Sequence, residues 1–129
     1  MHDRPARFVD NHDGDTATMM LDQDFFATQT INVRLANVWA PEPKDKGYVQ
    51  AKAYLRFLMV GQNAVEKWPF IVITHETATG NQVKSFDRFV ADIIRAIDGV
   101  SINSEMMKYL TQNGFTGGTG FPEPQGKKV

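Results

Sequence analysis

Apolar and polar residues alternate in three segments of the first third of the chain, namely 6–10, 16–21 and 30–38. This period of two is typical of β-strands, because successive side chains of a strand point to opposite sides. In the third segment, Ile31, Val33 and Leu35 share one face, and Arg34 lies on the other. We therefore expect the apolar face to be buried and Arg34 to point away from the core.

The segment 41–47 interrupts this pattern, since it contains two prolines, a glycine and a run of charged residues. Such a composition favours a mobile loop over a strand. From about residue 48 to 59, apolar residues recur at helical spacing with Lys52 and Arg56 on the opposite side, which predicts an amphipathic helix that ends at Gly61. Its predicted apolar positions are Ala51, Tyr54, Leu55 and Leu58.

Two more alternating segments, 68–77 and 86–94, are separated by the turn-forming residues Thr79, Gly80 and Asn81, which predicts a hairpin. A second helix is expected from about 103 to 113, with Asn103 as its N-cap and Gly114 as its end. Its predicted buried stripe is Met106, Met107 and Leu110.

Five strands, with one helix after the third and another after the fifth, indicate an α+β fold. The best match is a five-stranded Greek-key β-barrel of the oligonucleotide-binding (OB) type with two packed α-helices, and a generic α+β sheet packed on two helices is the alternative. We expect one domain over residues 6–115, because a chain of 129 residues has room for a single core. Residues 116–129 lack apolar periodicity and predict a flexible, Gly/Pro-rich tail.

Charge and cysteine content narrow the functional classes. The net charge of −1 argues against a module that binds nucleic acid tightly, because such modules usually have an excess of basic residues. It argues less against a nuclease, because an enzyme needs only a local basic site. The absence of cysteine excludes disulfides and thiolate metal sites. We expect a cytoplasmic protein that does not contact a membrane, because no signal-peptide pattern and no apolar run of ~20 residues is present. The sequence predicts no oligomeric state.

Candidate chemistry begins with the segment Asp13-Gly14-Asp15-Thr16. In an extended segment, Asp13 and Asp15 face the same side, and two carboxylates are a start on an oxygen-rich site for a hard cation. The alternative interpretation is an ordinary turn, which these residue types favour.

Two arginines offer planar forks of N–H donors for phosphate, Arg34 and Arg88. A surface salt bridge is the alternative for each. Phe86 shares a strand face with Arg88, which suits base stacking beside phosphate binding, although Phe86 also fits a core position. Lys44 and Lys46 are further candidates for phosphate attraction, or simply solvated loop residues.

Five segments in this order resemble the micrococcal nuclease, or thermonuclease, family: Asp13-Gly14-Asp15-Thr16, Arg34-Leu35 leading to Pro41-Glu42, Gln50-Ala51, Asp87-Arg88 and Ile102-Asn103. The resemblance covers nearly all of residues 8–115. It implies the barrel fold and a calcium-assisted cleavage of DNA and RNA that leaves 3′-phosphates. It also implies that Arg34 and Arg88 hold the scissile phosphate, and that Glu42 is the general base that activates water. For Glu42 the alternative is a solvated loop acid.

One residue departs from the pattern of that family. Trp39 stands where the family has an aspartate that binds calcium, and an indole has no oxygen to replace it. The metal ligands that the resemblance leaves are Asp15, Asp13 at longer range and the carbonyl of Ala40, completed by water, Asp45 or substrate phosphate. The Gly-rich ending also departs from the tyrosines and third helix of the family.

The leading hypothesis is a metal-dependent endonuclease, with calcium as the expected ion, acting on single-stranded or frayed DNA and RNA. Because of Trp39, the alternative is a catalytically impaired module that binds nucleic acid or protein. A third interpretation, a structural or interaction protein with unrelated partners, leaves the pattern of acids and arginines unexplained. His12 is interpreted as a bystander, and no role is assigned to His75.

Overall fold

The computed structural model describes residues 2–75, 84–85 and 88–115. Its five barrel strands are β1 (His2–Asn11), β2 (Thr16–Asp22), β3 (Thr28–Leu35), β4 (Phe70–Thr74) and β6 (Arg88–Arg95). They follow the order β3, β2, β1, β4, β6, and a parallel pairing of β6 with β3 closes the barrel. The short strand β5 (Lys84–Ser85) pairs with the start of β6. The prediction of an α+β, OB-fold-like Greek-key barrel is confirmed.

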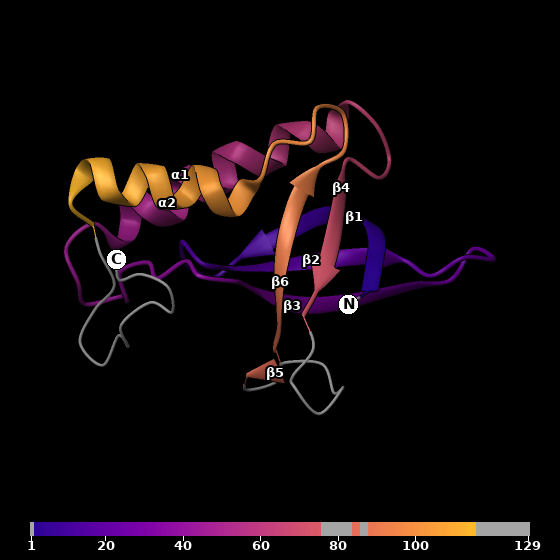
Figure 1. The fold of residues 1–129 in the computed structure, drawn as a ribbon, viewed down its shortest axis with the longest axis horizontal. Coiled ribbons are helices and arrows are strands. Elements are labelled where there is room, and N and C mark those ends of the chain that lie inside the picture. The colour runs from indigo at the N-terminus through magenta and orange to yellow at the C-terminus, as the bar shows by residue number, and fades with distance from the viewer. Residues whose placement is uncertain (1, 76–83, 86–87, 116–129) are drawn as a thin grey trace.

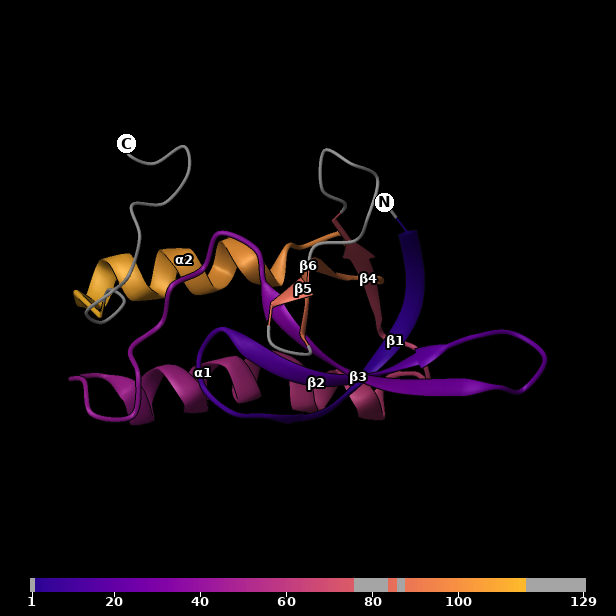
Figure 2. The same cartoon turned by 90° about the horizontal axis from the view of Figure 1, so that it is seen from below.

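Two helices accompany the barrel at the predicted places in the chain. The helix α1 (Tyr48–Val60) joins β3 to β4 and continues into a 3-10 turn, η1 (Gly61–Ala64), while α2 (Ile102–Asn113) follows β6. Both helices lie on one side of the molecule, and the β2–β3 hairpin projects on the other side (Figures 1 and 2). Within the described residues, no helix has the length and apolar character needed to cross a membrane.

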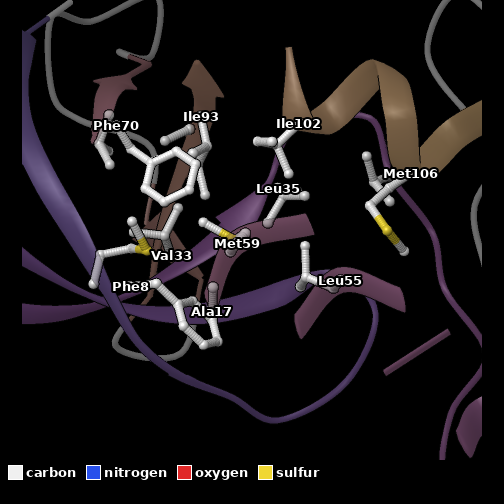
Figure 3. Close-up of a cluster of buried hydrophobic side chains, with 14 of the residues drawn as sticks. Phe8, Ala17, Val33, Leu35, Leu55, Met59, Phe70, Ile93, Ile102 and Met106 are labelled. Atoms are coloured by element: carbon white, nitrogen blue, oxygen red, sulfur yellow. The ribbon is translucent and has the colours of Figure 1, made fainter. Parts of the chain in front are cut away.

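The core forms where the inner face of the barrel meets the two helices (Figure 3). Val33 and Leu35 are fully buried, and Ile31 packs against the cluster, as the alternation in this strand predicts. The helices contribute their apolar stripes to the same cluster, namely Ala51, Leu55 and Met59 from α1 and Ile102, Met106 and Leu110 from α2. A single core therefore holds the sheet and both helices together.

Several predicted boundaries are corrected. The third strand ends at Leu35 and not at residue 38, because the chain turns at Asn37, whose φ of 62° is in the left-handed region. The fourth strand covers only Phe70–Thr74. The predicted turn at residues 79–81, the tail 116–129 and the candidate Phe86 lie outside the described residues.

The start of α2 differs from the prediction in a way that matters for the site. Ser101 is the N-cap, because its Oγ accepts a hydrogen bond of 3.1 Å from the backbone N of Ser104. Asn103, the predicted cap, instead lies inside the first turn and is buried. Met107 is 37% exposed, so its assignment to the buried stripe is wrong. Gly114 ends the helix with a φ of 69°, as predicted.

Candidate functional site

The acidic segment forms a tight loop between β1 and β2 that is tied to α1. The side-chain amide of Asn11 donates to the backbone carbonyls of Asp13 (3.0 Å) and Lys52 (2.9 Å). The hydroxyl of Tyr48 donates to the carbonyl of His12 at 2.8 Å. These bonds fix the loop against α1. They therefore also fix the positions of the two acids in the loop, Asp13 and Asp15.

Gly14 explains why this loop can approach the rest of the site so closely. A Cβ atom at this position would lie 2.8 Å from the Cβ of Ala40 and 2.9 Å from the Cβ of Ala51. Real Cβ atoms do not come this close, so only glycine allows the loop to pack against both neighbours. The loop is thereby placed beside the segment that follows β3.

The Asp15 carboxylate lies at the centre of the site and is only 13% exposed. Its Oδ2 accepts a hydrogen bond of 2.9 Å from the backbone N of Ala40, and its Oδ1 accepts one of 3.2 Å from the hydroxyl of Thr16. The backbone N of Asp15 donates to Oδ1 of Asp13 at 3.1 Å. The two acids therefore lie close together, but in a tight turn and not in the extended segment that the prediction assumed.

The pKa of the Asp15 carboxyl is raised to about 7, chiefly because burial disfavours its charged form. The neighbouring Asp13 adds to this rise through its charge and a hydrogen bond, while the Ala40 amide and Arg34 oppose it. A carboxylate in this state gains from a bound proton or a bound cation.

Arg34 supplies the nearest positive charge and is packed on several sides. Its Nη2 lies 3.8 Å from Oδ2 of Asp15, and its side chain is 19% exposed. Its Nη1 donates to the backbone carbonyl of Leu35 at 3.0 Å. Its Cζ lies 5.4 Å from the centre of the Trp39 ring, within the range of a cation–π contact. The guanidinium is therefore held in one orientation.

The loop after β3 closes on itself near Glu42. The backbone N of Glu42 donates to Oδ2 of Asp45 at 3.0 Å, and the backbone N of Asp45 donates to the carbonyl of Glu42 at 2.8 Å. Pro41 is buried, whereas the side chains of Glu42, Lys44 and Lys46 are exposed. The loop therefore holds the backbone of Glu42 and leaves its carboxylate in water.

The predicted partner arginine is only partly described. The backbone of Arg88 lies at the start of β6, paired with Asn32, two positions before the Val90–Arg34 pair. The side chain of Arg88 lies outside what the structure describes, as does the whole of Phe86. The structure thus brings together Asp13, Asp15, Ala40 and Arg34, and puts the backbone of Arg88 on the strand next to Arg34.

A metal ion would find side-chain oxygens from two residues here. Among the described residues, no three histidine, aspartate or glutamate side chains come together as a set for a metal ion. The side chain of Trp39 has no oxygen, and its ring faces Arg34. Asp13 and Asp15 still suit a divalent cation, because a cation relieves the repulsion and burial that raise the pKa of Asp15. The residues fit an ion whose remaining ligands come from backbone, water or a bound phosphate, since calcium takes six to eight oxygens.

Two contacts of the site were not anticipated from the sequence. The stacking of Trp39 on Arg34 depends on the turn at Asn37, for which the only local signal is that asparagine tolerates a positive φ. The ties from Asn11 and Tyr48 join residues whose types are unremarkable in a strand and a helix. No periodic pattern in the sequence predicts either contact.

No protein-family model matches this sequence, and a search of curated proteins finds no match either.

Proposed function

We propose that the protein is an endonuclease that hydrolyses phosphodiester bonds of DNA, RNA or both, in single-stranded or frayed regions. The observation that carries this proposal is the fixed guanidinium of Arg34 beside Asp15. An arginine has five N–H donors, and the one hydrogen bond that Arg34 donates to a described residue goes to the Leu35 carbonyl. The other donors remain for a phosphate, whose binding then requires little reordering of the side chain.

Glu42 is the proposed general base. Its backbone is held by Asp45 while its carboxylate is exposed, so it can accept a proton from a water molecule that attacks the phosphorus atom. The bond between phosphorus and the leaving oxygen breaks as the water oxygen bonds to phosphorus, and the leaving oxygen takes up a proton from solvent. Arg34 and Arg88 neutralise the charge that develops on the phosphate oxygens. Phe86, Lys44 and Lys46 are the proposed contacts for the rest of the nucleic-acid strand.

Asp13, Asp15 and the carbonyl of Ala40 would hold the divalent ion, with calcium as the first candidate. When bound, the ion would supply Lewis-acid polarisation of a phosphate oxygen. With carboxylates from only two residues, we expect weaker binding than in a site with three.

A cleavage assay tests this function. The purified full chain is incubated with labelled single-stranded DNA and RNA in calcium, magnesium, manganese or a chelator. We expect metal-dependent cleavage that falls by roughly 10²-fold or more in Glu42→Gln and in Arg34→Ala. Lys108→Ala, an exposed substitution on α2 at a side chain that is 63% exposed, is the matched control and should leave cleavage unchanged. Absence of cleavage in every ion would overturn the proposal.

The second candidate is a nucleic-acid-binding barrel without catalysis. Trp39 favours it, because this residue covers Arg34 with a ring where the resembling family has a metal-binding acid. The same assay separates the two candidates when binding is measured in parallel. Retained binding of oligonucleotides without cleavage in any ion supports the second candidate.

A further inference from the structure

A second polar cluster lies outside the site described above, at the end of β4. Nε2 of His75 lies 3.0 Å from Oδ2 of Asp92 on β6. The side chains of both residues are about one-third exposed, at 34% and 38%. The imidazole is therefore both oriented by a partner and reachable from solvent.

The buried Asn103 holds this pair through Asp92. Its Nδ2 donates to Oδ1 of Asp92 at 3.1 Å, and also lies within hydrogen-bond distance of the carbonyls of Ala91 (3.1 Å) and Ala36 (3.0 Å). Its Oδ1 accepts from the backbone N of Ile93 at 3.0 Å. Since Asn103 is only 6% exposed, these bonds fix the Asp92 carboxylate. Ala36 directly follows β3. Asn103 therefore connects the His75–Asp92 pair to the segment between β3 and Glu42, which contains Trp39.

The register of the strands puts His75 in line with Arg34. Arg34 on β3 is the partner of Val90 on β6, and the backbone N of His75 donates to the carbonyl of Val90 at 3.1 Å. Residues 89, 91 and 93 point inward along β6, as the burial of Ala91 and Ile93 shows, so Val90 and Asp92 belong to the outer face. The backbones of Arg34 and His75 are thus two strand spacings apart, about 10 Å.

The chemistry of the pair favours a neutral partner over a phosphate. The bond between Nε2 of His75 and Oδ2 of Asp92 occupies one of the two ring nitrogens. In the tautomer in which Nε2 donates this bond, Nδ1 is an acceptor. Within the described part of the chain, no hydrogen bond to Nδ1 is present. The nearby Asp92 charge would repel a phosphate. An acceptor in this position suits the amino group of a nucleobase.

Given the proposed nuclease function, on which this step depends, we propose that His75 contacts the base of the nucleotide whose phosphate binds Arg34. Asp92 and Asn103 act as positioning residues for the ring. Adenine, cytosine and guanine carry an exocyclic amino group that can donate to Nδ1, whereas thymine and uracil do not. His75 therefore confers a preference for bases that carry an amino group.

Binding of labelled homopolymers of about 12 nucleotides tests this inference. The measurements use the full chain with Glu42→Gln, so that cleavage does not interfere. We expect oligo(dC) and oligo(dA) to bind about threefold to tenfold more tightly than oligo(dT), the gain of one added hydrogen bond. His75→Phe keeps a ring but removes the acceptor and should abolish the preference. His75→Gln restores an acceptor oxygen and should recover part of it, and Lys108→Ala is the control.

The possible outcomes separate this inference from the proposed function. An unchanged preference in His75→Phe, or no preference in the parent protein, overturns the role of His75 while leaving cleavage to be judged by its own assay. If the parent protein neither binds nor cleaves any oligonucleotide, both proposals fail. Thermal unfolding of each variant shows whether a lost preference reflects a lost fold.

Discussion

The indole of Trp39 covers the guanidinium of Arg34, whose Cζ lies 5.4 Å from the ring centre. The side chain of Arg34 is thus held by the Trp39 ring and by the Asp15 carboxylate, and not by two carboxylates. The neighbouring Asp15 has a pKa that is raised chiefly by burial and further by Asp13. Trp39 thus contacts the arginine that we propose binds phosphate, and it stands where the resemblance leads us to expect a cation ligand.

Replacing Trp39 with aspartate should strengthen binding of calcium. The added carboxylate would provide a third acidic ligand, and we expect the affinity to rise by roughly tenfold or more. Isothermal titration calorimetry measures it. Trp39→Phe keeps a ring without adding an oxygen and should not increase the affinity. Equal calcium affinities of Trp39→Asp and the parent protein would show that residue 39 does not face the cation.

The buried acid Asp15 should make the metal-free protein less stable as the pH rises. Its pKa is about 7 in the folded chain and 3.8 ordinarily, so the folded state binds more protons between these values. The free energy of unfolding should therefore fall between about pH 4 and pH 7 through this group. Asp15→Asn removes the dependence and should be more stable than the parent protein at pH 8, as urea unfolding across this range would measure.

Asp98→Asn is the control for that measurement, with the opposite sign. The hydrogen bond to Arg95 lowers the pKa of the exposed Asp98, so this carboxylate stabilises the fold above its ordinary pKa and ceases to do so as the pH falls. Asp98→Asn should slightly lower the free energy of unfolding at neutral pH. A stability of Asp15→Asn that tracks the parent protein at every pH would contradict the burial of Asp15.

Gly14→Ala should destabilise the protein by about 1–3 kcal/mol, because its Cβ would clash with Ala40 and Ala51. Gly61 offers a matched control: its φ of −67° is helical and nothing lies within 4 Å of an added Cβ. Gly61→Ala should be neutral or stabilise by up to about 1 kcal/mol. Thermal or urea unfolding compares the two, and similar effects at both positions would argue against the close packing of the acidic loop.

Asn103→Ala should cost about 2–4 kcal/mol of the free energy of unfolding, because it leaves the buried N–H of Ile93 and the carbonyl of Ala36 without this partner. Asn113→Ala removes a single exposed bond to the carbonyl of Tyr109 and should cost less than about 1 kcal/mol. Denaturant unfolding distinguishes the two variants. A small effect of Asn103→Ala would mean that the hydrogen bonds of Asn103 to the backbone of β6 are not needed to hold α2 against that strand.

The architecture was largely predictable because its signals are local. The alternation around Val33 and the helical spacing around Leu55 each report which side of one element is buried, and both were confirmed. The error at the start of α2 has a physical cause. Ser101 and Asn103 are both acceptable caps by residue type, and Asn103 is drawn inward by backbone groups of β6 that are distant in sequence.

The sequence by itself determined the order of strands and helices and the buried faces, and it supplied the acids and arginines of the candidate site, because periodicity and residue chemistry depend on near neighbours in the chain. Only the tertiary structure decided that Asp15 is buried beside Arg34, that Trp39 covers that arginine, and that Asp92 holds His75. These contacts join residues across turns and strands, and the burial that shifts the pKa of Asp15 exists only after the chain has folded.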